Sequence, residues 1–163
     1  MPNGKGIRLS ISTDEAHVPG YIGIITEVAQ AFAEFRGFDS DTAGEFSIAI
    51  DEIAMNAIKH GNKFDPAKTA IICFYHSDDR VGAYAEDQST EKFDPTPHFR
   101  KEVSADATRD ELLSSSGRGF ILIANYTDFQ RYKWLNPGNR VYVEKLKPRL
   151  RGLSLSDERQ LCQ

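Results

Sequence analysis

The N-terminal part of the chain changes from a two-residue to a helical hydrophobic period. In "GIRLSIS", residues 6–12, every second side chain is apolar, which predicts a strand with one buried face. From Pro19 to Phe35, apolar residues recur every three or four positions and predict a helix. Pro19 suits the first turn of a helix, because its missing N–H would have no intrahelical acceptor there. Gly37 then ends this helix.

The next stretch predicts a second helix, which ends at Gly61. Its start is rich in residues whose side chains can cap a helix. Thr42 and Glu45 are spaced as a capping box, and Ser40 is an alternative cap.

A polar stripe borders the apolar arc of this second helix. In "DEIAMNAIKHGN", residues 51–62, Glu52, Asn56 and His60 follow one another at intervals of four. Asp51 lies well away from this stripe on the helical wheel and is expected to point into water. The stripe is either a solvent-facing edge or one wall of a ligand site, and the rest of the chain must decide between them.

Two hairpins are predicted in the second half. "TAIICFYH" (69–76) and "RVGAYAE" (80–86) are strands joined by a short polar turn. "QRYKWLNPGNRVYVEKL" (130–146) forms the other hairpin, which turns at residues 136–139.

A long polar segment, residues 88–116, separates the two hairpins. It is followed by "GRGFILIANYTDF", which opens with glycines and continues as an apolar helix. Loops of this length in a small domain are typical of lids or binding segments. Residues 105–113 within it are expected to form a short helix. The element order predicts an α/β (α+β) two-layer sandwich, a mostly antiparallel mixed sheet with helices on one face. The domain would span residues 1–146, and residues 147–163 would be a mobile tail.

Composition narrows the class of protein. The chain has 163 residues, 40% of them hydrophobic, and a net charge of −4, so direct nucleic-acid binding is not expected. No apolar run approaches the roughly 20 residues that cross a bilayer, and the N-terminus lacks the apolar core of a signal peptide. With only Cys73 and Cys162, neither a disulfide framework nor a zinc site is indicated. We therefore expect a cytoplasmic domain that does not contact a membrane.

Three short segments carry candidate chemistry. Glu52 and Asn56 share a helix face, where a carboxylate can accept a proton and an amide oxygen can bind Mg²⁺. Asp87 ends a strand, where it is either a turn residue or an acceptor for an amine. In "SSSGRGF", residues 114–120, two glycines allow close backbone approach, and the helix behind them offers N–H groups to an anion. Each feature alone also fits an ordinary helix surface, turn or loop.

In combination, the three segments resemble the GHKL (Bergerat-fold) ATPase superfamily, and more narrowly the anti-sigma-factor serine/threonine protein kinases. "IAIDEIAMNAIKHG" is similar to the asparagine-containing helix of that family, and "SSSGRGFILIANYTD" to its second glycine box. "EDQSTEKFDP" stands where the family has its first glycine box. Here the chain departs from the pattern, because Ser89 and Glu91 replace the two glycines and the spacing to Phe93 is one residue longer.

The resemblance implies a role for each matching residue. Glu52 would be the base or water-orienting carboxylate, Asn56 would hold Mg²⁺ on the phosphates of ATP, and Asp87 would read adenine. The residues implied around the nucleotide are Asn56, Lys59, His60, Asp87, Phe93, Ser116, Gly117, Arg118, Gly119 and Phe120.

The implied function is an anti-sigma factor and serine/threonine kinase. It would bind a sigma factor and phosphorylate an anti-anti-sigma protein of the sulfate-transporter-and-antisigma (STAS) type, and relatives suggest a possible homodimer. The alternative is a binding module that keeps the fold but has lost phosphoryl transfer, given Ser89 and Glu91. A histidine-kinase catalytic domain is a third interpretation. Such enzymes need a helix that carries the accepting histidine, and the residues before residue 7 are expected to leave no room for it, which argues against this interpretation.

Overall fold

The computed structural model describes residues 6–99 and 115–148, with the backbone alone for residues 115–117. Its elements follow one another in the order β1 (Gly6–Ser12), α1 (Val18–Phe35), α2 (Ser40–Met55), η1 (Asn56–Gly61), β2 (Thr69–His76), β3 (Arg80–Glu86), η2 (Thr96–His98), α4 (Ser115–Tyr126), β4 (Phe129–Trp134) and β5 (Asn139–Leu146).

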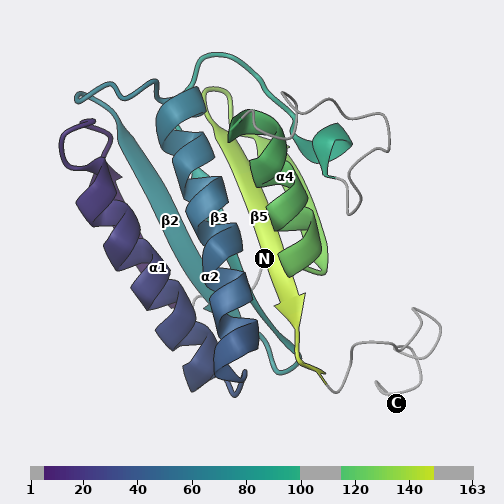
Figure 1. Cartoon of the computed structure of the whole chain (residues 1–163). Coiled ribbons are helices and arrows are strands. Elements are labelled where there is room, and N and C mark those ends of the chain that lie inside the picture. Colours follow the sequence, from purple (N-terminus) through teal and green to yellow (C-terminus); the bar gives the residue numbers. More distant parts are fainter. Residues whose placement is uncertain (1–5, 100–114, 149–163) are drawn as a thin grey trace.

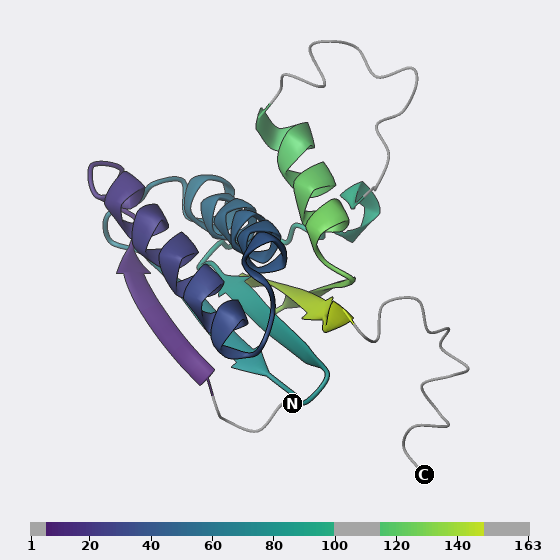
Figure 2. The same ribbon diagram turned by 60° about the horizontal axis from the view of Figure 1, so that its bottom comes forward.

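The five strands form one sheet in the order β1-β2-β3-β5-β4, and every neighbouring pair is antiparallel. Helices α1, α2 and α4 all cover the same face of this sheet (Figures 1 and 2). The prediction of an α+β two-layer sandwich is therefore confirmed. The described sheet is antiparallel throughout rather than mixed. Two helices that run in opposite directions, α1 and α2, connect β1 to β2, so the chain enters β2 antiparallel to β1 (Figure 1).

The core lies between the sheet and α2, the central helix. Phe46 and Ile50 of α2 are fully buried, as are Val81 and Ala83 of β3. Burying a large aliphatic or aromatic side chain contributes about 1.5–3 kcal/mol, so this layer supplies much of the stability. The alternating residues of the predicted strands at 69–76 and 80–86 account for the sheet half of the core, and both strands have the predicted bounds.

A buried lysine ties the central helix to its neighbour. Lys145 of β5 is 0% exposed, and its Nζ donates to Glu45 Oε2 of α2 at 2.9 Å and to the carbonyl of Tyr126 at 2.8 Å. Tyr126 ends α4, where the helix dipole favours a cation. Lys145 therefore fixes the spacing between α2 and α4.

The start of α2 differs from the predicted capping. Asp39, not Thr42 or Ser40, is the N-cap, and its Oδ1 accepts the backbone N–H of Thr42 at 2.9 Å. The Thr42 hydroxyl donates to Asp39 Oδ2 at 2.7 Å instead of capping the helix itself. The carboxylate prevails because Asp39 stands directly before the first helical residue, in extended conformation.

The end of the same helix is also different from the prediction. Residues Asn56–Gly61 form a wide π-turn instead of continuing the α-helix to Gly61. The N–H of Asn62 reaches the carbonyl of Ala57 at 2.9 Å, a five-residue step. An extra residue in the turn changes the directions of the side chains from Asn56 to His60, and such turns are frequent at functional sites.

The remaining predictions have mixed outcomes. The polar segment after Asp87 contains the short helix η2, and the predicted helix at 105–113 lies outside the described residues, as does most of the predicted tail. Within residues 6–99 and 115–148, no helix has both the length and the apolar character needed to span a membrane.

Candidate functional site

A cavity of about 270 Å³ opens between η1, the 87–99 segment and α4. Its floor is apolar and consists of Ile53, Ala57, Ala85, Ile123 and Val141. Its polar lining is Asn56, His60, Asp87, Ser89, Glu91 and Asn139, and three phenylalanines, Phe93, Phe99 and Phe120, form an aromatic side. A cavity with an apolar floor and few polar groups suits a small organic ligand with a polar end.

Asp87 is a buried, hydrogen-bonded residue of this cavity. It is 7% exposed, and its Oδ1 accepts the backbone N–H groups of Ser89 and Asn139, both at 2.9 Å. Its Oδ2 has only a long contact, 3.3 Å, with Asn139 Nδ2. One carboxylate oxygen thus anchors the loop, while the other retains capacity to accept a hydrogen bond from a ligand.

Gly61 makes room for this carboxylate. A Cβ at Gly61 would overlap the side chain of Asp87, including Oδ2. The sequence predicts Gly61 as a helix stop, but the reason for a glycine here is the close approach of η1 to Asp87.

Asn139 connects the cavity loop to the sheet and was not identified from the sequence. Its Nδ2 donates to the Asp87 carboxylate and to the carbonyl of Glu91, while its Oδ1 accepts from the Phe93 N–H at 2.9 Å and the Tyr132 hydroxyl at 2.8 Å. Asparagine at a turn usually bonds to its own backbone neighbours, so no local pattern indicates this longer-range role.

Asn62 is a second buried residue that the sequence did not identify as part of the site. It is 0% exposed, and its Oδ1 accepts the N–H of Gln88 at 2.8 Å. This bond joins the end of η1 to the residue after Asp87. The Asn62 side chain therefore fixes the end of η1 to the segment that follows Asp87.

Glu52 lies beside the start of α4. A Cβ at Gly119 would overlap Glu52 Oε2, so the carboxylate reaches the helix backbone. Half-burial raises the pKa of Glu52, and the Asp51 charge raises it further, whereas the Arg118 charge lowers it. A carboxylate with a raised pKa is suited to exchange a proton near neutral pH.

Asp51 does not point freely into water as predicted. It is half-buried, burial raises its pKa, and its Oδ1 is a buried atom without a hydrogen-bond partner among the described residues. The helical wheel considered α2 alone, whereas α1 and α4 flank it on both sides (Figure 1). Less of its surface is therefore open to solvent.

The glycine segment lies within a helix rather than before one. Because α4 begins at Ser115, Gly117 and Arg118 belong to its first turn, where backbone N–H groups lack helical acceptors, and Gly119 follows in the next turn. Arg118 is exposed and Gly119 is buried, while Phe120 lines the cavity. Nothing is described of the Ser116 side chain.

The other predicted residues divide into two groups. Asn56, His60, Asp87, Phe93 and Phe120 all line the cavity. Burial lowers the pKa of His60, and the Lys59 charge lowers it further. Lys59 itself is exposed and does not line the cavity.

The residues that replace the expected glycines have structural partners. Ser89 is buried, its Oγ accepts the N–H of Glu91 at 3.0 Å, and its carbonyl accepts the N–H of Gly138 at 2.8 Å. Glu91 is at the cavity rim and faces Lys63 at 3.4 Å. With side chains 77% and 66% exposed, this ion pair contributes little stability.

Comparison with known proteins gives the family. The family model "Histidine kinase-like ATPase domain" matches residues 15–145. No curated protein matches the chain. The matched range contains the polar stripe of α2 and η1, Asp87 and the start of α4, and it extends over most of the sequence. The chain therefore belongs to the histidine kinase-like ATPase family.

Proposed function

We propose that this domain binds Mg²⁺–ATP in the cavity and transfers a phosphoryl group to a serine or threonine of a partner protein. The supporting observation is that three segments distant in sequence meet at one place. Asn56 and Asp87 line the same cavity, and Glu52 contacts Gly119 at the start of α4.

The residues present fit a nucleotide. The apolar floor and the aromatic side suit a purine, and Asp87 Oδ2 can accept the hydrogen bond of an exocyclic amine. Asn56 would hold Mg²⁺ through its amide oxygen, since this metal commonly takes few protein ligands besides phosphates and water.

Glu52 is the candidate for proton transfer. When bound, Mg²⁺–ATP supplies the phosphoryl group, and positioning and charge neutralisation carry most of the rate of such reactions. Glu52 would orient the accepting hydroxyl and take its proton. The Arg118 charge lowers the pKa of Glu52, and the same guanidinium would offset the negative charge of the phosphates beside it.

The partner proteins are proposed from the resemblance to anti-sigma-factor kinases. The domain would bind a sigma factor, and the accepting hydroxyl would belong to a STAS-type anti-anti-sigma protein. This circuit requires that phosphorylation of the antagonist changes which of the two partners is bound.

Calorimetry and a transfer assay test the proposal in sequence. Titration with a non-hydrolysable ATP analogue, with and without Mg²⁺, measures binding. Incubation with ATP and a candidate STAS protein, followed by mass spectrometry, detects phosphoserine or phosphothreonine. Absence of metal-dependent binding would refute the nucleotide site itself.

A binding module without phosphoryl transfer is the second candidate. Ser89 and Glu91 close the loop that the family usually builds from glycines, and Glu91 places a carboxylate at the cavity rim. Tight nucleotide binding without transfer to any tested STAS protein would favour this candidate.

Asn56→Ala is expected to weaken Mg²⁺-dependent nucleotide binding by at least about tenfold, because a metal ligand is lost. Affinity measured in the presence of a chelator should change little. Asn125→Ala, an exposed position on α4, provides the matched control. Equal affinity of Asn56→Ala and the unchanged protein in Mg²⁺ would remove the metal role from Asn56.

Glu91→Gln is expected to raise nucleotide affinity by roughly two- to fivefold, the range for an exposed charge interaction. The gain should shrink at high salt, because exposed charges are screened. Glu27→Gln on the exposed side of α1 controls for the change in net charge. A gain that persists undiminished in high salt would indicate relief of crowding instead of charge.

A further inference from the structure

The sheet face opposite the helices carries ordered rows of polar and aromatic side chains. Alternation along β3 places Val81 and Ala83 in the core and so directs Tyr84 to the other face. The strand register aligns Tyr84 with Cys73, Tyr142 and Arg131 across four strands. In the part of the chain that the structure describes, no helix covers this face (Figure 2).

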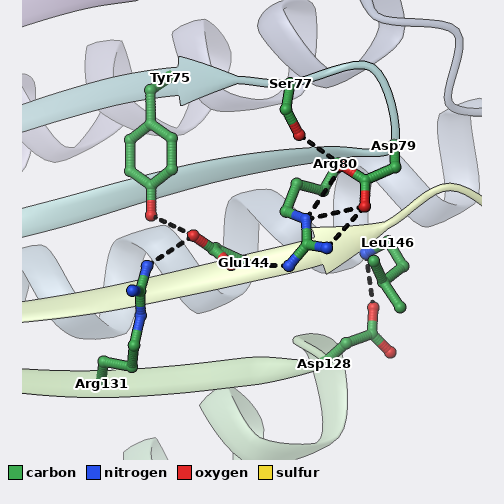
Figure 3. A network of polar contacts seen from close by, with 8 residues as sticks. All are labelled: Tyr75, Ser77, Asp79, Arg80, Asp128, Arg131, Glu144 and Leu146. Atoms are coloured by element: carbon green, nitrogen blue, oxygen red, sulfur yellow. Dashed lines mark hydrogen bonds and ion pairs between the residues drawn. The ribbon is translucent and has the colours of Figure 1, made fainter. Parts of the chain in front are cut away.

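One network on this face is centred on Glu144, which is 8% exposed. Its carboxylate accepts from the Tyr75 hydroxyl at 2.9 Å, from Arg131 at 2.7 Å and from Arg80 at 3.2 Å (Figure 3). Gly82 allows this arrangement, because a Cβ there would overlap the Tyr75 ring. The guanidinium groups are thus fixed in place before any partner arrives.

A neighbouring cluster stacks arginines on tyrosines. The rings of Tyr84 and Tyr142 are 5.4 Å apart. Arg140 lies 4.5 Å from the Tyr84 ring centre and Arg131 lies 5.3 Å from that of Tyr142. Arg140 also donates to Glu86 at 2.6 Å. Tyrosine and arginine are among the residue types most enriched in the energetically dominant parts of protein interfaces.

The charge of this face is opposite to that of the whole chain. By strand alternation its cationic side chains are Arg8, Arg80, Arg131, Lys133 and Arg140. The carboxylates among its described residues are Glu86 and Glu144, and Asp79 in the adjoining turn pairs with Arg80. A cationic surplus therefore stands on a chain whose net charge is −4.

We propose that this face docks an acidic segment of a partner protein, independently of the cavity. Charge complementarity favours such a partner and would speed its association. Nucleic-acid bases fit less well, because Arg140 and Arg131 lie over the tyrosine rings on which bases would stack. A second copy would bring two cationic faces together. Residues 149–163 contain three arginines and two acidic residues, so they would not supply the missing negative charge.

The test uses a labelled dodecapeptide of alternating glutamate and serine, with a lysine–serine peptide and a dodecamer of deoxythymidine for comparison. Fluorescence anisotropy of the full chain at low salt should show preferential binding of the glutamate peptide. Arg8→Glu/Lys133→Glu should reduce this affinity at least about tenfold, the scale expected when charges are placed like against like. Both positions are exposed, so folding should survive.

Lys68→Glu/Lys92→Glu is the matched control, because it changes the net charge by the same amount at positions outside this sheet face. It should alter the affinity for the glutamate peptide less than about twofold if only the sheet face binds the peptide. Circular dichroism confirms that each variant is folded, and Arg131→Gln provides a second test with a smaller change. No binding, equal loss in both double variants, or tighter binding of the oligonucleotide would overturn the proposal. Light scattering that shows a dimer lost in Arg8→Glu/Lys133→Glu would assign the face to a second copy instead.

Discussion

Replacing Glu52 with glutamine is expected to reduce phosphoryl transfer by about 10²–10⁴-fold, the usual contribution of a positioned acid or base. Glutamine keeps the shape of the side chain beside Gly119 but cannot accept a proton. Nucleotide affinity should remain within a few-fold, because Glu52 does not line the cavity. Single-turnover transfer to a STAS protein measures the rate, and calorimetry measures the affinity. A normal transfer rate in Glu52→Gln would refute the assignment of the base.

The pH dependence of phosphoryl transfer separates a proton-accepting role of Glu52 from a structural one. The rate should fall as pH drops through the pKa of Glu52, because only the carboxylate accepts a proton. Asp51 raises that pKa, so Asp51→Asn should move the acidic limb to lower pH. Arg118 lowers it, so Arg118→Gln should move the limb to higher pH when measured at saturating nucleotide. If neither variant moved the limb, the titrating group would be another residue.

The sheet and its helices could be predicted because their patterns are local. In β2 and β3, alternating apolar residues are bounded by polar turns, so period and length agree with the final strand. In α1, the apolar stripe, Pro19 and Gly37 all indicate the same helix. No partner distant in the sequence was needed to recognise these elements.

The details of α2 could not be predicted for a different reason. Asp39, Thr42 and Ser40 all have side chains that cap helices, and composition alone does not choose among them. The π-turn at residues 56–61 follows from contacts on both sides: Asn62 bonds to Gln88, and Gly61 fits against Asp87. These partners come from a strand end more than twenty residues away, which no local period encodes.

The candidate site was predictable as a set of segments but not as a connected structure. Asn56, Asp87 and Phe120 were identified because their residue types and order resemble a family pattern. The groups that hold them, Asn139 and Lys145, were not, since an asparagine in a turn and a lysine in a strand are usually exposed. Their roles follow from burial, because a buried amide or ammonium group must find partners. Asn139 bonds to Asp87 and Glu91 of the cavity, whereas Lys145 bonds to Glu45 and Tyr126 and so joins α2 to α4.

This arrangement explains how a loop without the usual glycines can keep a defined cavity. Glycine loops are mobile and close on a ligand, at a cost in conformational entropy. Here hydrogen bonds of Ser89 and Asn139 hold residues 87–91 in one conformation. The loop therefore loses less conformational entropy when a ligand binds. Nucleotide exchange would then depend on entry past Glu91, and on little rearrangement of residues 87–93.

Asp87→Asn is expected to lower ATP affinity by about 10- to 150-fold, which corresponds to the roughly 1.5–3 kcal/mol of a hydrogen bond to a charged group. The new amide can still accept the N–H groups of Ser89 and Asn139 through Oδ1. Its Nδ2 would then face both Asn139 Nδ2 and the amine of adenine, so donors would oppose donors. Inosine triphosphate carries a carbonyl oxygen in place of that amine, so the variant should bind it as well as ATP or better. Calorimetric titration of both nucleotides measures this selectivity.

Asp39→Asn is the matched control, because it makes the same substitution at the cap of α2, outside the cavity. It should change stability slightly and leave the preference for ATP over inosine triphosphate intact. Chemical denaturation of both variants separates the two effects: a loss of stability in Asp87→Asn with unchanged nucleotide selectivity would mean that Asp87 only anchors the loop. A selectivity change confined to Asp87→Asn requires instead that Oδ2 of Asp87 contacts the base, and this would place adenine in the cavity beside Asp87.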